Sequence, residues 1–536
     1  MLNIYYGREN LDKSKFIFDN IEGKALLIVP DQYTLEAERD AFFYLNKRAI
    51  IDIEVMSFSR LGEIIVSKAG RKVDVLGKAG RQMILTKIIR EKAKELEVFY
   101  GSSRKIDFVT MVHDLISELK QHNTTKEAIS EAIDAIEKDS LLKRKLKEIL
   151  IIYTAYQNYT EGKYLDNEDY ISFYVSLMEK SGYIHGKTIW IYGFDSFSDK
   201  NISIIKELNR LAINVNLVLN YDPSSKGEEL FSLSRYMIDK LENIIGDVNT
   251  EAISANYKRM SQSSDIVAIE KEIFKFPVVS QVDNGNIRLQ KALNPYNEAV
   301  NAALFVLNLV RDKGYRYNEI ALISNDIENK GSLYQRVFSE YGMDLYIDIK
   351  RGILHHPAVN YILALMEVVR HNYQREDVIR MVKSGLVIES DEDIEKLEIY
   401  SKIFNIKGIL WRRDFSKGVS KYGEEYVNRL NEIRAEIINP IMNFNKAFTD
   451  GKTVEKKVNA LYEFLEKISI NEKLEDISKK LEDENKLELA QENSQIWNAV
   501  TSILGQMVEG LGDEKISKDD FVEILKSGFE AIEIGL

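Results

Sequence analysis

The residues with the strongest chemical character in this 536-residue chain stand near its N-terminus. Gly7, Lys13 and Ser14 occupy the first glycine, the lysine and the hydroxyl of the phosphate-binding pattern G-x-x-x-x-G-K-[ST]. Asp12 stands where the pattern has its second glycine. Because such a loop points backbone N–H groups at phosphate oxygens and relies on glycine for close approach, a carboxylate there opposes a polyphosphate. The pattern predicts a degenerate nucleotide site; a working site and a chance match are the alternatives.

A second candidate follows an apolar run at residues 188–192. Asp195 stands where a P-loop ATPase holds the aspartate that coordinates magnesium, which makes it a possible Walker B-like residue. The glutamate that would prepare the attacking water is absent, since Ser196 follows Asp195. Both departures weaken the case for ATP hydrolysis.

Metal sites are not predicted elsewhere. Asp166, Glu168 and Asp169 have the spacing of a helix N-terminal turn, where carboxylates complement the helix dipole. His355 and His356 are adjacent and therefore point to different faces of one element. Capping or surface roles are expected for all five residues.

Alternating strands and helices must position the N-terminal loop. Such alternation predicts a parallel sheet with crossover helices. The expected strands span 2–6, 25–29, 51–56, 188–192 and 214–219. One expected helix follows each of the first three strands, and these helices span 13–21, 34–44 and 61–68. Residues 78–180 show helical periodicity only, which predicts a helical insertion into this sheet domain.

A second α/β segment is expected after a polar boundary at residues 254–290. We expect a helix at 298–313, a strand at 319–324, a helix at 334–341 and a short strand at 344–347. From residue 359 onward the pattern is mostly helical and acidic.

Composition excludes several classes of protein. The chain has no cysteine, which rules out disulfides and cysteine-held metal clusters within it, and it has neither a signal peptide nor an apolar run of about 18 residues. A cytoplasmic protein without a membrane segment is expected. The net charge of −12 divides into −3 over residues 1–300 and −9 over the remainder. Nine basic residues against two acidic ones, Asp74 and Glu91, mark residues 68–94 as a candidate basic surface.

Six segments in order resemble one protein family. They are GRENLDKS at 7–14, VPDQYTLEAE at 29–38, VMSFSRL at 55–61, YLDNED at 164–169, IYGFDSF at 191–197 and YRYNEIAL at 315–322. The chain resembles the AddB (RexB) family along its whole length. AddB is a subunit of the AddAB helicase–nuclease, which processes double-strand DNA breaks in bacteria.

The resemblance implies an α/β architecture similar to superfamily 1 helicases of the UvrD type, with two RecA-like parallel-sheet domains and large helical insertions. RecA-like domain 1A would take residues 1–75 plus 185–280, with helical insertion 1B at 76–184. Residues 286–370 would form the first part of RecA-like domain 2A, and a 2B-like helical insertion would fill 371–536. AddB-like proteins are about twice as long, and the C-terminal nuclease domain with its iron–sulfur cluster and Mg²⁺ would be absent here.

The resemblance also implies a function. AddB is thought to have lost its motor while serving to bind DNA and recognise the Chi sequence, so no catalytic residue and no cofactor are expected in this piece, and the degenerate loop argues against ATP binding. Ser57, Phe58 and Arg60 resemble a helicase motif that contacts single-stranded DNA, and Arg81 is a further DNA-binding candidate. The implied partners are an AddA-type subunit in a heterodimer, single-stranded DNA and duplex ends.

Two other functions stay open. Lys13 and Ser14 are retained, so an active DNA-stimulated ATPase is one alternative. The acidic charge after residue 300 favours protein contacts, so an architectural subunit that only docks the partner motor is the other.

Overall fold

The structure is a computed structural model that describes residues 1–47, 49–73, 75–224, 229–259, 263–274, 277, 284–347, 350–388 and 390–535. Asp74 and parts of the predicted boundary at 254–290 lie outside the described residues. The chain divides into two compact units. The first comprises Met1–Val75, Leu115–Glu131 and Thr160–Gln290, and the second comprises Leu76–Asp114, Ala132–Tyr159 and Lys291–Leu536.

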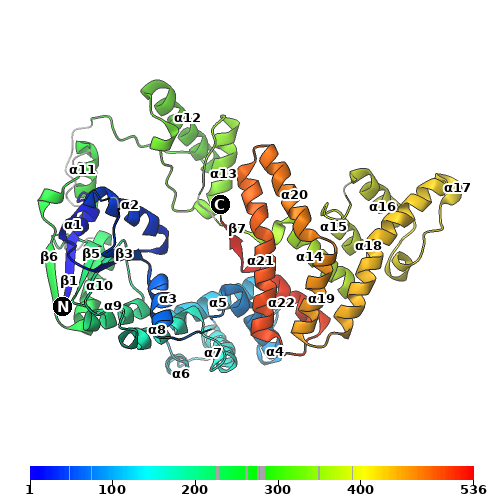
Figure 1. Ribbon diagram of the computed structural model, residues 1–536, viewed down its shortest axis with the longest axis horizontal. Coiled ribbons are helices and arrows are strands. Elements are labelled where there is room, and N and C mark those ends of the chain that lie inside the picture. The colour runs from blue at the N-terminus through cyan, green and yellow to red at the C-terminus, as the bar shows by residue number, and fades with distance from the viewer. Residues whose placement is uncertain are drawn as a thin grey trace. The chain divides into compact units, whose positions relative to one another are not determined.

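The first unit is built around a six-stranded parallel sheet with strand order β3-β2-β4-β5-β1-β6 (Figure 1). The strands are β1 (Leu2–Gly7), β2 (Ala25–Ile28), β3 (Ile53–Met56), β4 (Thr188–Tyr192), β5 (Asn214–Asn220) and β6 (Val248–Ala252). Each pairs with its neighbours in parallel, for example Leu27 with Val55 and Ile28 with Ile191. This confirms the predicted α/β class and parallel sheet.

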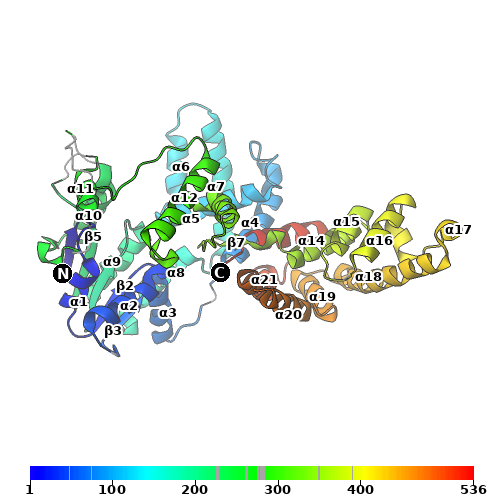
Figure 2. The same cartoon turned by 90° about the horizontal axis from the view of Figure 1, so that it is seen from above.

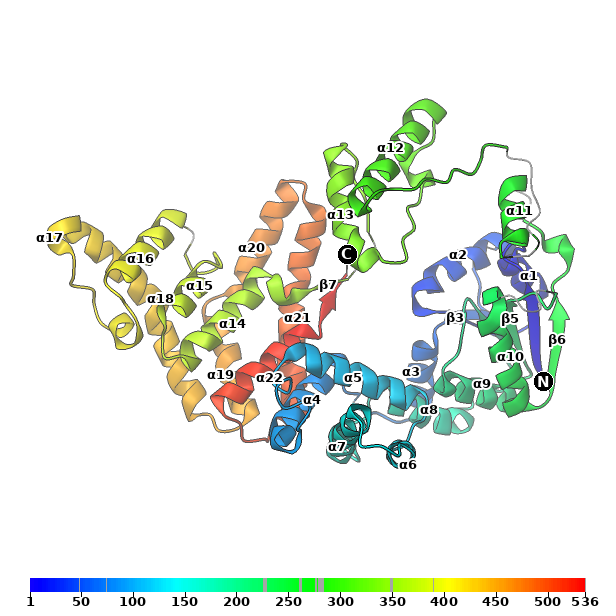
Figure 3. The ribbon, with the colours of Figure 1, turned by 180° about the vertical axis from the view of Figure 1, so that it is seen from behind.

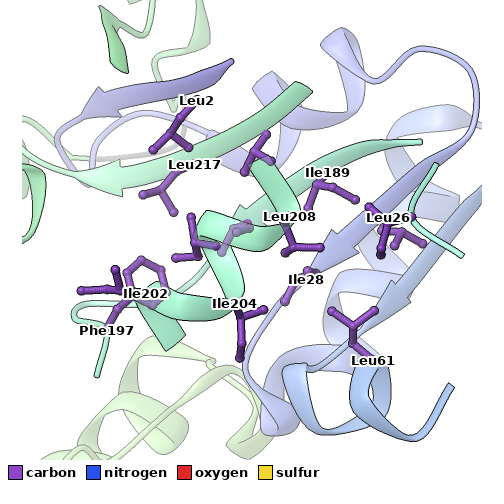
Figure 4. Packing of buried hydrophobic residues seen from close by; sticks show 14 of the residues in the cluster. Leu2, Leu26, Ile28, Leu61, Ile189, Phe197, Ile202, Ile204, Leu208 and Leu217 are labelled. Carbon is purple, nitrogen blue, oxygen red and sulfur yellow. The ribbon is translucent and has the colours of Figure 1, made fainter. Parts of the chain in front are cut away.

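Helices cover both faces of this sheet because its buried strands are apolar on both sides. Leu26 and Ile28 face a core shared with α3 (Phe58–Lys68), α8 (Asn167–Ser181), α9 (Asp199–Leu211) and α10 (Ser232–Ile245), as Figure 4 shows for part of that cluster. Leu27 and Val29 face the other core, which includes α1 (Lys13–Asn20) and α2 (Thr34–Leu45). The carboxyl ends of the strands meet at one edge, which is where the candidate residues lie.

The second unit is mostly helical. Its longest helices are α18 (Glu424–Asp450) and α21 (Leu487–Leu511), and α20 (Ile470–Asp483) packs side by side with α21 (Figures 1 and 3). The helix α4 (Lys78–Lys92) packs against α21 and α22 (Lys518–Glu530). Figure 2 shows α14 (Pro357–Arg370), α15 (Arg375–Val382), α16 (Asp391–Ile403) and α17 (Val419–Tyr422), which belong to the same unit. Among the described residues, no helix combines the length and apolar character needed to cross a bilayer.

Two expected strands of the second α/β segment are not present. Residues 319–324 and 344–347 have no strand assignment, although the flanking helices α12 (Pro295–Lys313) and α13 (Ile327–Glu340) form and share a small core. A strand requires a neighbour for its backbone hydrogen bonds. No described strand lies beside either segment, so local apolar character alone did not produce a sheet. The superfamily 1 architecture and the domain names stay predictions, and residues 76–184 contribute to both units.

Candidate functional site: a closed loop and an aromatic cavity

The loop after β1 folds back over the end of its own strand. Gly7 ends β1, and a Cβ atom placed there would lie 2.5 Å from Leu11 Cδ1. The Leu11 side chain therefore covers Gly7 from within the loop and packs against the core that includes α1 and α2. In a working phosphate-binding loop this space is left to the phosphate oxygens. Here the glycine serves close packing by a leucine.

Asp12 uses its polar groups inside the protein. Its carboxylate accepts hydrogen bonds from the Lys15 backbone N at 2.9 Å, which caps α1, and from the Tyr44 hydroxyl at 2.9 Å. Its backbone N–H donates to the Tyr257 carbonyl at 2.7 Å. Burial, together with the bond to Asp12, raises the pKa of Tyr44 to about 12. The residue that departs from the nucleotide-binding pattern thus holds α1, α2 and the 255–257 turn together.

Lys13 is buried and already has hydrogen-bond partners. The residue is 1% exposed, and its Nζ lies 3.1 Å from the Arg8 carbonyl and 3.2 Å from the Glu9 carboxylate. Burial lowers the pKa of the Lys13 ammonium, while Glu9 opposes that shift. An ammonium held by its own loop is not presented to the β- and γ-phosphates that the pattern assigns to it.

Arg8 fixes the loop from its other side. Its guanidinium pairs with Asp222 at 2.6 Å, just after β5, and donates to the Glu270 carbonyl at 2.6 Å in α11 (Ser264–Glu272). A charge-assisted pair of this length restrains both partners more than a neutral hydrogen bond does. The loop is therefore tied to two elements far away in the sequence.

Ser14 faces two tyrosines. Tyr33 and Tyr192 pack edge to face with ring centroids 5.9 Å apart. Burial raises the pKa of each phenol, and the nearby Ser14 hydroxyl partly opposes that rise. The hydroxyl that would hold magnesium thus lies beside two phenols.

Asp195 lies apart from this network. The strand β4 ends at Tyr192, and Asp195 follows in an exposed turn. The strand β5 separates β4 from β1 in the sheet, so the two candidate parts lie at the same edge on strands that are not neighbours. The residues of the loop do not fit a triphosphate with magnesium in this conformation, and no reaction step is assigned to them.

The second feature at this edge is a cavity of about 660 Å³ at the carboxyl ends of β2, β3 and β4. Its lining is aromatic and apolar with two carboxylates, and it includes Phe58, Tyr170, Tyr174, Phe194, Asp31 and Glu63. The rings of Phe58 and Phe194 lie 5.3 Å apart, and Phe58 is half-buried. A half-buried ring beside an open cavity is able to stack a nucleobase.

Ser57 and Arg60, the neighbours of Phe58, differ in whether a ligand can reach them. Ser57 is 4% exposed and its hydroxyl accepts from the Arg60 backbone N at 3.2 Å, so it caps α3. Arg60 is exposed and pairs with Glu63 at 2.6 Å. Phe58 and Arg60 are therefore the residues of this trio that can meet a ligand.

The chain is similar to a known protein family and to curated proteins of that family. The family model described as ADDB, N-terminal, matches residues 4–270, which cover the loop, the sheet and the cavity. The chain belongs to the AddB family. Curated relatives that are named as a subunit of an ATP-dependent helicase/deoxyribonuclease include proteins of Alkaliphilus metalliredigens (strain QYMF), 31% identical, and Alkaliphilus oremlandii (strain OhILAs), 32% identical. Each match covers 99% of this chain and 49% of the relative. The chain thus spans about half the length of these AddB relatives.

Arg81 does not have the position predicted for an AddB DNA contact. It is 6% exposed on α4, where ten of the fifteen residues are buried. Its neighbours in the basic stretch are also engaged: Lys87 pairs with Glu91 and lies over the Tyr159 ring, and Arg90 pairs with Asp520 at 2.7 Å. Arg81 therefore offers little exposed surface for the DNA contact that was predicted for it. The physical reason is that α4 is a core helix of the second unit, which its charge count did not reveal.

The acidic segment YLDNED at residues 164–169 has a structural role. Asp166 caps α8 through the Asp169 backbone N at 2.9 Å, and the buried Lys120 ammonium binds the carboxylates of both Asp166 and Asp169. His356 caps α14 and bonds to Asn493, while His355 is exposed. No cluster of potential metal ligands occurs among the residues that the structure describes.

Sequence reasoning missed two of the cavity residues. Phe194 follows β4 and is brought to Phe58 by the pairing of β2 with both β3 and β4. Tyr170 lies on α8, which packs against α3. The rule that ligands bind outside the carboxyl ends of parallel strands would have directed attention to the segment after β4.

Proposed function

We propose that this chain is the helicase-like half of a subunit of a bacterial double-strand-break repair helicase–nuclease, and that it binds DNA without using ATP. The proposal that ATP is not used rests on Lys13, which is buried and whose ammonium is hydrogen-bonded to Glu9 and to the Arg8 carbonyl. Opening the site would require breaking these contacts together with those of Asp12. The loop acts as a scaffold of the sheet edge.

DNA binding is assigned to the cavity beside Phe58. The Phe58 and Phe194 rings supply a stacking surface, and the exposed Arg60, which pairs with the cavity residue Glu63, supplies a cation for a phosphate. The carboxylates of Asp31 and Glu63 disfavour close phosphate approach inside the cavity, so a base enters and the backbone stays at the rim. Single-stranded DNA is the ligand that offers unpaired bases. We propose that this binding of single-stranded DNA also supports recognition of the Chi sequence.

A partner protein is also part of the proposal. The names of the relatives describe a subunit of a larger enzyme, and an AddA-type subunit would supply the motor. The sequence contains no cysteine that could hold an iron–sulfur cluster, and we expect no nuclease activity from these residues.

Two measurements test the proposal. ATP hydrolysis with oligo(dT) should equal that of a mock purification, for both the wild type and K13A; a DNA-stimulated rate that K13A abolishes would establish the ATPase alternative. Binding of fluorescein-labelled oligo(dT) should weaken about 5- to 150-fold in F58A, the equivalent of about 1–3 kcal/mol per stacked base. The matched control is F43A, because Phe43 is exposed on α2 away from the cavity. Undetectable binding at low salt would favour the architectural subunit.

A further inference from the structure

The acidic second unit contains one strongly basic segment. Residues 401–422 hold six basic side chains and a single acidic one, Asp414. The basic residues are Lys402, Lys407, Arg412, Arg413, Lys417 and Lys421, and all six are exposed. The segment runs from the end of α16 through a 3-10 turn at Gly408–Arg412 to α17. Because the chain from 301 to 536 has a net charge of −9, this segment stands apart from its surroundings.

The charge of this segment is not neutralised within the protein. Asp414 binds the guanidinium of Arg434, a buried residue of α18. Among the described residues, none of the six exposed cations has a carboxylate within ion-pair distance. Arg412 lies over the Tyr373 ring at 4.5 Å and donates to Asn372, and Lys421 lies over the Tyr422 ring. Lys407 interacts electrostatically with the Glu376 carboxylate. In the part of the chain that the structure describes, the exposed Lys402, Arg413 and Lys417 have no carboxylate or aromatic ring as a partner.

The segment is a folded surface rather than a charged tail. Trp411 and Phe415 are buried beneath it, and Arg434 donates to the Trp411 carbonyl. Its two ends meet, since the Tyr400 hydroxyl donates to the Lys417 carbonyl at 2.8 Å. A Cβ atom at Gly418 would lie 2.7 Å from the Phe404 ring, and the φ of Gly418 is +80°. The side chains of Tyr400 and Phe404 thus contact the chain at 417–418, which brings the two halves of the segment together.

We infer that this basic segment is a second DNA-binding surface, which holds the phosphate backbone of duplex DNA. Two aromatic rings of the segment, Trp411 and Phe415, are buried and unavailable to stack on bases. Its exposed side chains include the six cations and the apolar Ile403, Ile409, Leu410 and Val419. The cations suit phosphates on the outside of a duplex and carry no base specificity. This surface lies in the other unit from Phe58 and does not depend on the cavity.

The experiment uses the whole 536-residue chain and a covalently closed, relaxed circular duplex, which has neither ends nor unpaired loops to offer to the cavity. The test variant is K402Q/K407Q/R413Q/K417Q, which leaves Arg412 and Lys421 beside their aromatic rings. The matched control is K446Q/K467Q/K480Q/K526Q, four exposed lysines of the same unit that carry the same change in charge. Equal thermal unfolding of both variants and the wild type is the check on folding.

We expect the test variant to bind the closed duplex at least tenfold more weakly than the control in low salt. The slope of log K against log salt should fall in magnitude by about 0.9 for each phosphate that the variant no longer neutralises, so by up to about 3.6. Equal affinity of the test and control variants would overturn the inference. Equal competition by poly-L-glutamate and by duplex would overturn the assignment to DNA. F58A should leave this binding unchanged, so a failure here is separate from a failure at the cavity.

Discussion

The Tyr44 hydroxyl donates a hydrogen bond of 2.9 Å to Asp12, the residue that replaces the second glycine of the phosphate-binding pattern. The same carboxylate caps α1 through the Lys15 backbone N. Compared with the glycine of the pattern, Asp12 therefore adds a side chain that links α1 to α2. These contacts give the loop a structural role in a protein for which we propose no ATP turnover.

The Asp12 network predicts a measurable loss of stability. D12A should lower the free energy of unfolding by about 1 kcal/mol through the lost helix cap, and by about 1 kcal/mol more through the Tyr44 bond. Urea denaturation of D12A, Y44F and the double variant should give a coupling of about 1 kcal/mol. D19A is the control, because Asp19 is exposed on the same helix. Strict additivity of D12A and Y44F would show that the bond contributes nothing.

The pair Arg60–Glu63 beside the aromatic cavity predicts opposite effects of two substitutions on the binding of oligo(dT). R60Q should reduce the magnitude of the salt slope for oligo(dT) by about 0.7, the value for one neutralised phosphate of a single strand. E63Q should tighten binding, because Glu63 pairs with Arg60 and lines the cavity. R39Q, an exposed cation of α2 outside the cavity lining, should behave as the wild type. Weaker binding by E63Q would contradict this arrangement.

The buried Lys120 predicts a large structural effect. K120M leaves the 3%-exposed Asp166 carboxylate without its cation, and loss of one partner of a buried pair costs about 3–5 kcal/mol. Burial lowers the pKa of Lys120, but Asp166 and Asp169 outweigh it and raise the net value. The contribution of Lys120 is therefore complete below its unfolded pKa of about 10.4.

The difference in unfolding free energy between the wild type and K120M should accordingly be constant from about pH 6 to about pH 9 in urea titrations. K126M, at an exposed lysine of the neighbouring α6 (Lys126–Asp134), should change stability by less than about 0.5 kcal/mol. A similar small change in K120M would mean that the carboxylates find other partners.

Lys457 predicts a dependence on alkaline pH. It is 3% exposed, its Nζ donates to the Phe448 carbonyl at 2.8 Å, and burial lowers its pKa to about 8. Between about pH 8 and about pH 10.4 the unfolded chain binds the proton that the folded chain has released. Stability from this site therefore rises with pH, by at most about 1.4 kcal/mol per pH unit.

The test compares the wild type with K457M at several pH values, since other titrations cancel in the difference. The stability of the wild type relative to K457M should increase from about pH 8 to about pH 10. K456M, which replaces the exposed neighbouring lysine, should show no such trend. A flat difference for K457M would mean that the buried amine stays charged.

Two helical glycines predict opposite effects of alanine. A Cβ atom at Gly62 in α3 would lie 2.7 Å from the Tyr174 ring, which is 1% exposed, so G62A should destabilise by about 1–3 kcal/mol through overpacking. Gly505 in α21 has open space around its Cα, so G505A should stabilise by up to about 1 kcal/mol through helix propensity. Thermal melts of the two variants check both signs. Stabilisation by G62A would show that α8 moves readily away from α3.

The pattern of the sequence predicted the parallel sheet and five of its six strands, but not the edge strand β6 (Val248–Ala252). Ala25 to Val29 is apolar at every position, which requires a strand covered on both faces, and the structure places Leu26 and Leu27 in two different cores. The strands expected at 319–324 and 344–347 were predicted from local pattern in the same way but did not form. A strand is stable only with a partner, and partners are not encoded locally.

The same division holds for the opening loop. Its residue types alone determined that Gly7, Lys13 and Ser14 follow a nucleotide-binding pattern with a carboxylate in the place of one glycine. Only the tertiary structure decided what Asp12 does, because Tyr44 and Tyr257, which bind its polar groups, come from distant parts of the chain. Arg81 shows the converse, since its charge suggested a surface and packing placed it in a core. Sequence spacing specifies which atoms are available, and packing specifies which of them remain free.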